Sequence, residues 1–465
     1  MQTTRRSFLK VSAAAASALA FPTIIPARVL GAAAPSKRLR VAQIGCGRIA
    51  FTMDMPGVVG TKLADFVAVS DYDAHRAAYA KEYLEGAYKK AKLTVPDIAV
   101  CGDYKEILAR ADVDAVVIST PDHQHAEPAA AAALAGKDIW LQKPLAMAIA
   151  ESRACCDTVT KAQRVLQIGS QQRSSEQFRK ACEYVRSGRI GRITHVEIGL
   201  PKDDTKADDP EQPVPPHLNF DAWLGPTPKV YYTEQAVHSQ KLSKGKPDIN
   251  SRPGWLRNED HTLGMITGWG SHHFDIMHWG LGIVEGGPEK VEGEAEFPTN
   301  KIWNVHLGYK LQYTYPGNII VNVSDKYPNG VKFIGDEGWI FVSRGSVKTT
   351  ASDPTTGGKP LKALDASKPS LITGEASTKL YVSKNHHMNW VECIQSRKEP
   401  ITPVINGHHV FAACSVGWVA MKLKRPLKWD AKAEKFIGDD EANSMLRRAE
   451  RPGYGVFNLL AKQKA

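Results

Sequence analysis

A glycine-rich turn constrains the fold of this chain more than any other feature of its sequence. Residues 40–50 read RVAQIGCGRIA, and the next apolar run ends in Asp71. Gly45 allows a sharp turn out of a strand, and Gly47 lets the backbone approach a pyrophosphate at the N-terminus of the following helix. Ala50 is small enough for that helix to pack against the strand. Strand, loop, helix, strand and acid in this order predict the first half of a dinucleotide-binding βαβ unit.

Asp71 predicts which dinucleotide binds. An acid at this position accepts hydrogen bonds from both hydroxyls of the adenosine ribose, and its charge disfavours the 2′-phosphate of NADP. The sequence therefore predicts NAD, held by the turn residues Gly45, Gly47, Arg48 and Ile49 together with Asp71.

The first 34 residues differ in character from the rest. Residues 4–10 read TRRSFLK, an Ala-rich apolar run follows over 11–25, and small residues occupy 31–34. This is the pattern of a twin-arginine signal peptide, which predicts export in the folded state to the periplasm. The apolar run is short and contains Pro22, so we expect no stable membrane insertion.

Composition and charge exclude other classes of protein. The chain has 465 residues, of which 43% are hydrophobic and 23% charged, as in soluble globular proteins. The net charge is +11, but the basic residues outside the leader are scattered and not clustered with aromatic residues, which disfavours nucleic-acid binding. The seven cysteines show no metal or disulfide spacing, so we expect small buried thiols.

Hydrophobic patterning predicts two domains after the leader. Over residues 35–168, short apolar runs alternate with helical stretches, which predicts a doubly wound parallel sheet, a Rossmann domain. Over residues 169–465, successive strand-like runs from 290 to 344 predict an α+β domain with an open, largely antiparallel sheet. The Pro- and Asp-rich stretch 201–254 is a candidate lid or oligomer contact, or an ordered surface excursion.

A lysine stands at the end of one predicted strand. The run Asp138-Ile-Trp-Leu141 leads into Gln142-Lys143-Pro144. Ligands of open α/β sheets bind at the carboxyl ends of the strands. Lys143 could there hydrogen-bond or deprotonate a reacting hydroxyl, and the alternative is a surface lysine before a proline.

Several motifs in a fixed order resemble one family, the Gfo/Idh/MocA oxidoreductases. They are the Gly45 turn, Asp71, the run Thr120-Pro121-Asp-His-Gln-His125, Lys143-Pro144, and Gly270-Ser-His-His-Phe-Asp275-Ile-Met-His-Trp279. Three further stretches look like the twin-arginine-exported branch: Arg252-Pro-Gly-Trp255, Asn385-His-His-Met-Asn-Trp390 and Arg425-Pro-Leu-Lys-Trp-Asp430.

The resemblance implies roles for particular residues. Lys143 and His272 correspond to the catalytic lysine and the histidine or tyrosine that handles the substrate proton. Thr120, Pro121, His125, Gln142 and Lys143 join the expected cofactor-binding residues. Arg173 aligns with a substrate-contacting arginine of the family and is an expected substrate-binding residue. From the residues themselves we also expect Trp255, which could stack on a sugar, and His273, Asp275 and His387 to bind substrate. Two departures stand out, because the family usually has glutamate where this chain has Gln142, and many members have a catalytic aspartate where it has Gly268.

A metal site built from His272, His273, Asp275 and His278 is an alternative, but this spacing matches no zinc pattern, and we expect no metal. The expected protein is an exported NAD-dependent oxidoreductase that binds its cofactor tightly and acts on a sugar or glycoside hydroxyl, such as C3, as a homodimer or homotetramer. Two other hypotheses stay open: an NAD-dependent glycosidase that works by oxidation, elimination, hydration and reduction, and a non-catalytic sugar-binding protein with structural NAD.

Overall fold

The computed structural model describes residues 38–346 and 360–463. The chain divides into two units, 1–38 and 39–465, and the architecture below is that of the second unit. The predicted signal peptide, 1–34, lies outside the described residues. Within the described ranges, none of the helices combines the length and apolar character that a membrane crossing requires.

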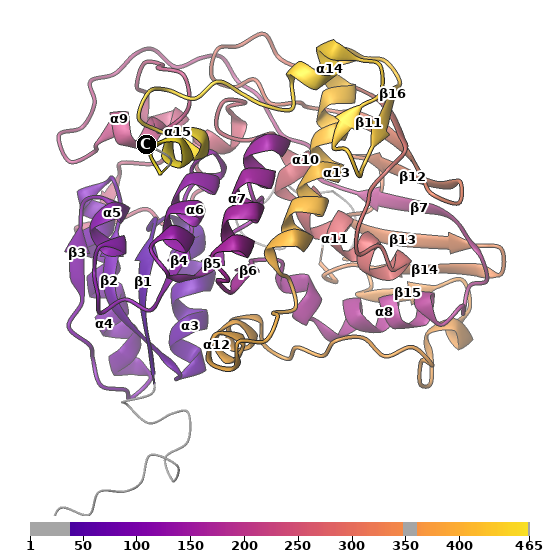
Figure 1. Cartoon of the computed structure of the whole chain (residues 1–465), viewed down its shortest axis with the longest axis horizontal. Coiled ribbons are helices and arrows are strands. Elements are labelled where there is room, and N and C mark those ends of the chain that lie inside the picture. The colour runs from indigo at the N-terminus through magenta and orange to yellow at the C-terminus, as the bar shows by residue number, and fades with distance from the viewer. Residues whose placement is uncertain (1–37, 347–359, 464–465) are drawn as a thin grey trace, which may run out of the picture. The chain divides into compact units, whose positions relative to one another are not determined.

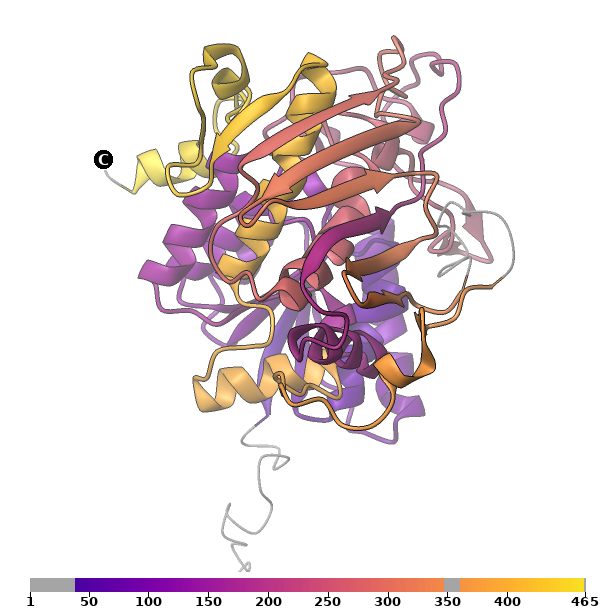
Figure 2. The same cartoon turned by 90° about the vertical axis from the view of Figure 1, so that its right-hand side faces the viewer.

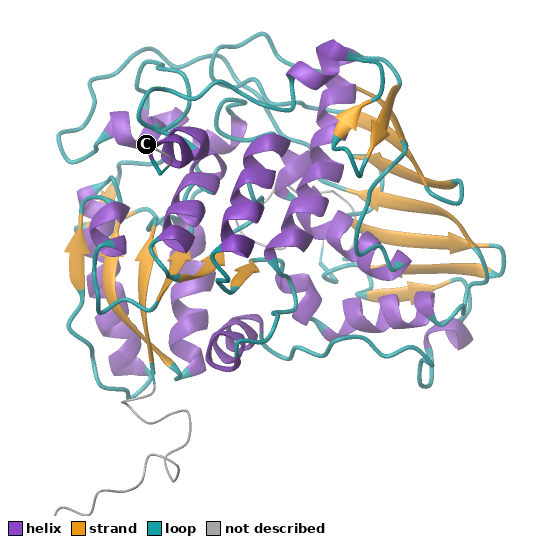
Figure 3. Ribbon diagram, viewed as in Figure 1, coloured by secondary structure: helices purple, strands orange, loops and turns teal. Residues whose placement is uncertain are grey.

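The first half of the unit is a six-stranded sheet in which every paired strand is parallel, in the order β3-β2-β1-β4-β5-β6. Its strands are β1 (Leu39–Ile44), β2 (Ala64–Ser70), β3 (Ala99–Cys101), β4 (Ala115–Ile118), β5 (Asp138–Leu141) and β6 (Leu166–Ile168). The helices between them are α3 (Met55–Thr61), α4 (Ala74–Lys90), α5 (Tyr104–Leu108), α6 (Ala126–Leu134) and α7 (Ile149–Lys161). This confirms the predicted doubly wound Rossmann fold (Figures 1 and 3).

The second half is built on a nine-stranded sheet in the order β15-β14-β13-β7-β12-β11-β10-β16-β17, which faces the viewer in Figure 2. Its strands are β7 (Ile193–Gly199), β10 (Lys290–Ala295), β11 (Tyr309–Tyr315), β12 (Ile319–Ser324), β13 (Gly330–Gly335), β14 (Gly338–Val342), β15 (Leu364–Ala366), β16 (Leu427–Asp430) and β17 (Lys435–Phe436). β7 pairs with β12 in parallel and the other neighbours are antiparallel, so the sheet is mixed but largely antiparallel, as predicted.

Helices cover the inner face of this sheet and join it to the first half. They are α8 (Glu176–Arg186), α10 (Met265–Gly268), α11 (Gly270–Leu281) and α13 (Val404–Leu423), and α13 also packs against α7 of the Rossmann half (Figure 1). The remaining elements are α9 (Phe220–Leu224), β8 (Leu242–Ser243), β9 (Lys246–Pro247), α12 (His386–Ser396), α14 (Asp440–Ser444) and α15 (Val456–Lys462). One apolar core runs through residues of both halves.

Helix α12 returns from late in the sequence to the Rossmann half. Trp390 is fully buried in the same apolar cluster as strands β1, β2 and β4, and its indole Nε1 donates to the carbonyl oxygen of Ile139 at 3.0 Å. The domain boundary expected at residue 168 therefore separates the elements in sequence order only. In space, helix α12, which comes after that boundary, belongs to the Rossmann core.

All seven cysteines are buried free thiols, as the absence of a disulfide pattern predicted.

Candidate active site

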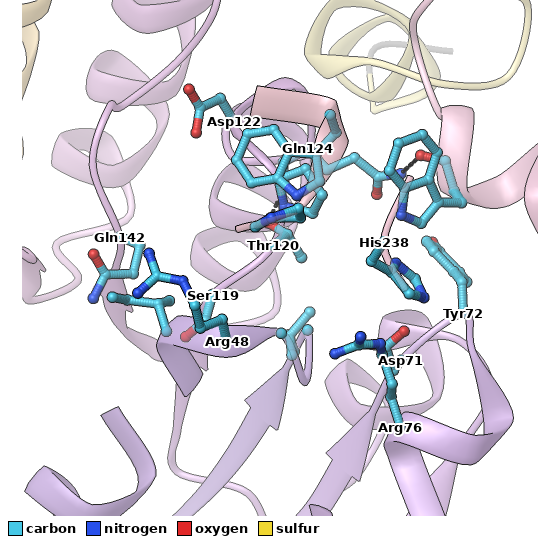
Figure 4. Close-up of a pocket in the computed structure, with 18 of the residues that line it drawn as sticks. Arg48, Asp71, Tyr72, Arg76, Ser119, Thr120, Asp122, Gln124, Gln142 and His238 are labelled. Atoms are coloured by element: carbon cyan, nitrogen blue, oxygen red, sulfur yellow. Dashed lines mark hydrogen bonds between the residues drawn. The ribbon is translucent and has the colours of Figure 1, made fainter. Parts of the chain in front are cut away.

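A cavity opens at the carboxyl ends of β1, β2, β4 and β5 (Figure 4). All ten predicted cofactor-binding residues line it: Gly45, Gly47, Arg48, Ile49, Asp71, Thr120, Pro121, His125, Gln142 and Lys143. Asp71, Tyr72, Arg76 and His238 lie at one end and Gln142 at the other (Figure 4). Since this edge of a doubly wound sheet binds dinucleotides across the point where strand order reverses, the Asp71 end fits the adenosine half of NAD and the Gln142 end its nicotinamide half.

The glycine turn has the geometry that a pyrophosphate needs. Gly45 has φ +80°, and a Cβ there would lie 2.9 Å from both the backbone N and Cγ2 of Thr120, so no other residue fits. A Cβ at Gly47 would meet only the Ser119 carbonyl oxygen, at 3.9 Å. The backbone at Gly47 is therefore open to an incoming ligand, and the residues present fit the cofactor.

Asp71 is held in place from its own side of the cavity. Its carboxylate accepts hydrogen bonds from the backbone N–H of Cys46 at 2.6 Å and of Asp73 at 2.8 Å. Burial, together with the nearby charge of Asp73, raises the pKa of Asp71 to about 6. The carboxylate is thus fixed where the ribose hydroxyls of the cofactor would lie.

The long stretch after β7 covers this end of the cavity. His238, Asp248 and Pro253 from this stretch, residues 201–254, all line it. His238 Nε2 lies 2.9 Å from the Asp73 carboxylate, and Arg76 Nη2 donates to the Asp248 carbonyl oxygen at 2.9 Å. Of the three hypotheses for this stretch, a lid, an oligomer contact or an ordered surface excursion, the contacts favour a lid that covers the adenosine site.

Trp255 was expected to contact substrate. In the structure it lines the cavity and packs against the same apolar cluster around Trp223 as Tyr72, which lies at the Asp71 end (Figure 4). Its position therefore favours contact with the adenosine half of the cofactor.

Lys143 follows β5 at the opposite end. Its Nζ donates to the carbonyl oxygen of Gly268 at 2.9 Å, which joins the Rossmann half to helix α10. Asp122, a buried carboxyl group that accepts from Thr262 Oγ1 at 2.8 Å, interacts electrostatically with Lys143, and burial raises its pKa. The ring of His125 bridges the carbonyl oxygens of Thr120 and Pro144, which ties the two loops around Lys143 together.

His272 lies in the first turn of α11 and interacts electrostatically with Lys143 and Arg344. It is 6% exposed, and its Nδ1 has no hydrogen-bond partner within the described ranges. Burial, then the charges of Arg344 and Lys143, lower its pKa well below the usual value, so the ring is neutral at pH 7. A neutral imidazole can accept a proton from a hydroxyl or orient it.

Four predicted substrate residues do not line the cavity. Arg173 and Asp275 form a buried ion pair, with Nη2 to Oδ1 at 2.7 Å and Nε to Oδ2 at 3.0 Å. Asn406 donates to the same carboxylate at 2.8 Å, so the pair joins α11 to α13. His273 Nε2 donates to Asn329 Oδ1 at 2.7 Å, and His387 contacts Asp54. These contacts fit structural roles.

The alternative metal site on α11 does not assemble. His273 contacts Asn329, Asp275 is paired with Arg173, and His278 Nε2 lies 3.0 Å from the hydroxyl of Tyr315. Elsewhere in the described ranges, Asp73, His75 and His217 bring ligand atoms within 4.8 Å of one another. There, however, Asp73 already caps α4 and contacts His238.

The sequence interpretation missed three residues near Lys143 and His272. Asp122 lies inside the family motif 120–125, so the sequence could have identified it as a candidate site residue. Arg344, just after β14, stacks on Trp269 with its guanidinium carbon 4.5 Å from the ring centroid. The Gln172 amide, oriented for hydrogen bonding, accepts from Arg344 Nε and donates to the His272 carbonyl, both at 3.1 Å. Arg344 had no sequence signal, because only the fold brings β14 to α11.

Comparison with known proteins agrees with the fold. The family model described as "oxidoreductase family, NAD-binding Rossmann fold" matches residues 39–170, and its "C-terminal alpha/beta domain" matches residues 202–456. The solved aldose-aldose oxidoreductase from Caulobacter crescentus, complexed with glycerol, superimposes with a TM-score of 0.54 at 18% identity, over 84% of this chain and 99% of that chain.

Two curated relatives match over shorter stretches. Inositol 2-dehydrogenase of Rhizobium meliloti (strain 1021) is 34% identical over 160 residues, which is 34% of this chain and 44% of that protein. Glycosyl hydrolase family 109 protein 2 of Shewanella sp. (strain ANA-3) is 32% identical over 211 residues, which is 42% of this chain and 45% of that protein. The chain thus spans less than half the length of these relatives. The two family models together cover most of the chain, which therefore belongs to the Gfo/Idh/MocA oxidoreductases and carries their NAD-binding Rossmann domain.

Proposed function

We propose that this protein is an exported NAD-dependent oxidoreductase that acts on a hydroxyl group of a sugar or glycoside, with C3 as one candidate position. The observation that carries the proposal is that Lys143 lines the nicotinamide end of the cavity and that His272, a buried side chain from the other half of the fold that does not itself line the cavity, lies within electrostatic reach of it. NAD, when bound, accepts or returns the hydride. The names of the relatives, an inositol dehydrogenase and a glycosyl hydrolase, support a carbohydrate as substrate.

The chain's own residues would manage the proton. Lys143 can hydrogen-bond or deprotonate the reacting hydroxyl, and neutral His272 can accept or orient its proton, as the carbinol carbon loses hydride. Asp122 is a buried carboxyl group within the electrostatic reach of Lys143. A non-catalytic sugar-binding protein would need neither Lys143 nor His272 at this place.

The leader and the cover over the adenosine site support tight retention of the cofactor. We infer that the twin-arginine leader directs folded, NAD-loaded protein to the periplasm, where the cofactor must be recycled in place. The open sheet would mediate a homodimer or homotetramer. Fractionation of cells that express the full chain, followed by cofactor analysis of the periplasmic protein, tests this part of the proposal. Recovery of the protein without cofactor, or only in the cytoplasm, would contradict it.

A second candidate is an NAD-dependent glycosidase. The similarity to a family 109 glycosyl hydrolase favours it, and Asp122 provides a carboxyl group near Lys143 for the elimination step. Mass spectrometry of products from a panel of sugars and glycosides distinguishes the two candidates, because the oxidoreductase yields a keto-sugar and the glycosidase yields free aglycone.

A further inference from the structure

A fully buried carboxylate, Asp54, lies directly behind the nicotinamide end of the cavity. It belongs to the π-helical turn Ala50–Asp54 that follows the glycine turn. Three side chains from different elements contact it: Ser119 Oγ at 2.7 Å, Gln142 Nε2 at 2.9 and 3.0 Å from its two oxygens, and His387 Nε2 at 3.3 Å. Ser119 and Gln142 also line the cavity, so Asp54 is one side chain away from it.

Ser119 and Gln142 both act as hydrogen-bond donors to the carboxylate oxygens of Asp54. Ser119 Oγ accepts from Gln43 Nε2 at 3.0 Å, so its own hydrogen is directed to Asp54. An amide Nε2 such as that of Gln142 can only donate. A carboxylate that receives these donors is satisfied in its ionised form.

The third partner is fixed by packing. His387 stacks on Trp140, with ring centroids 4.1 Å apart and an angle of 17° between the planes. A Cβ on Gly57 would lie 2.3 Å from His387 Nδ1, so the ring occupies the space that this glycine leaves. His387 does not line the cavity, so it contacts Asp54 from a side that the cavity does not reach, and Asp54 is fully buried.

Burial of a charged group costs desolvation free energy. A buried charge beside a binding cavity is therefore a candidate for a functional role. Ser119 follows β4 and Gln142 follows β5, the two strands on the nicotinamide side of β1. The next residue after Gln142 is Lys143. A negative charge here acts on whatever lies at that end of the cavity.

We propose that Asp54 is a positioning residue that fixes Gln142, and through it Lys143, and that its charge favours the oxidised, cationic nicotinamide over the reduced, neutral one. Gln142 is an amide because a second carboxylate beside Asp54 would repel it. The inference rests on NAD binding and not on the sugar proposed above, so the failure of either is separable from the other.

The test follows the cofactor in the loaded protein without any sugar. Wild type, Asp54→Asn, Gln142→Glu and the double variant Asp54→Asn/Gln142→Glu are equilibrated with a redox buffer through a soluble mediator, and bound NADH is read by absorbance. Asp54→Asn keeps an oxygen that accepts from Gln142 but removes the charge. We expect its bound ratio of NADH to NAD⁺ to rise about tenfold.

The double variant moves the charge from position 54 to position 142, with the new amide donating to the new carboxylate. We expect its ratio to return to within about threefold of wild type. A matched control is Asp138→Asn, which removes a buried carboxylate, paired with Arg397, from the other end of β5, and should leave the ratio unchanged. An unchanged ratio in Asp54→Asn, or a shift as large in Asp138→Asn, would overturn the proposal.

Should Asp54→Asn fail to fold, the other two variants decide. Gln142→Glu places two carboxylates together and is expected to lose thermal stability, and the double variant should recover it. A double variant no more stable than Gln142→Glu, with a bound-cofactor ratio unlike that of wild type, would show that the two residues do not share one charge.

Discussion

The amino group of Lys143 donates a 2.9 Å hydrogen bond to the main-chain carbonyl oxygen of Gly268. A carbonyl oxygen accepts a hydrogen bond but does not take up a proton at neutral pH. The lysine is thus oriented by backbone, at the position where many members of the family have an aspartate side chain. Because this chain has Gly268 where those members have aspartate, restoring a carboxylate at position 268 tests the proton chemistry of the site.

Gly268→Asp should shift the pH dependence of turnover. A Cβ at Gly268 would meet only Met265 Sδ, at 3.8 Å, so a Cβ is accommodated there without displacing backbone. A carboxylate beside Lys143 favours the ammonium form, so the acidic limb of the rate profile should move to higher pH by about one unit. Gly268→Ala is the control and should not move it. Superimposable profiles for wild type and Gly268→Asp would place Lys143 outside proton transfer.

Lys143→Ala should fold and retain NAD but turn over at least about a hundredfold more slowly, because a positioned acid-base group is lost. Lys89→Ala removes an exposed lysine in the last turn of α4 and should behave as wild type. Turnover and bound cofactor are measured on the same preparations. Parental turnover in Lys143→Ala would remove this residue from the mechanism.

The affinity for NAD should fall as the pH is lowered through about 6. The pKa of Asp71 is raised to about 6, so below that pH the carboxyl group is protonated and loses its charge-assisted hydrogen bonds to the ribose. In the cofactor-free protein, the folding stability depends on pH in the opposite direction to the NAD affinity. The folded state there binds the Asp71 proton more tightly than the unfolded chain does, so raising the pH from about 4 to about 6 lowers stability.

Titration of cofactor release against pH checks the Asp71 prediction, with Asp71→Asn as the comparison. The variant should bind NAD more weakly and without this pH step, and should discriminate less against NADP. Recovery of NADP alone from denatured wild-type protein would contradict the role given to Asp71.

Arg173→Ala should destabilise the fold by about 3–5 kcal/mol, because it leaves the Asp275 carboxylate buried without its cation. Burial already raises the pKa of Asp275. The double variant Arg173→Leu/Asp275→Leu removes both charges and should recover much of the loss. Chemical denaturation measures the stability, and a normal unfolding free energy with a raised KM would instead restore Arg173 to substrate binding.

The sequence predicted the parts of the fold that local patterns determine. The alternation of short apolar runs and helical stretches over residues 35–168 predicted the parallel sheet, and the glycine turn placed the cofactor cavity. The partners of Arg173 and His387 lie 102 and 333 residues away in the chain, and only long-range packing brings them together. The sequence did not mark Asp54 as a buried charge for the same reason, since Gln142 and His387, which contact it, lie 88 and 333 residues away in the chain.

Acceptor-free turnover with a glycoside substrate in deuterated water tests the central claim most directly. An oxidoreductase that retains its NAD should reduce about one cofactor per site and then stall, because the hydride has no acceptor. Bound NADH should appear in the same proportion as keto-sugar. Sustained release of aglycone without an added acceptor, with deuterium incorporated beside the transiently oxidised carbon, would contradict this account and establish the glycosidase instead.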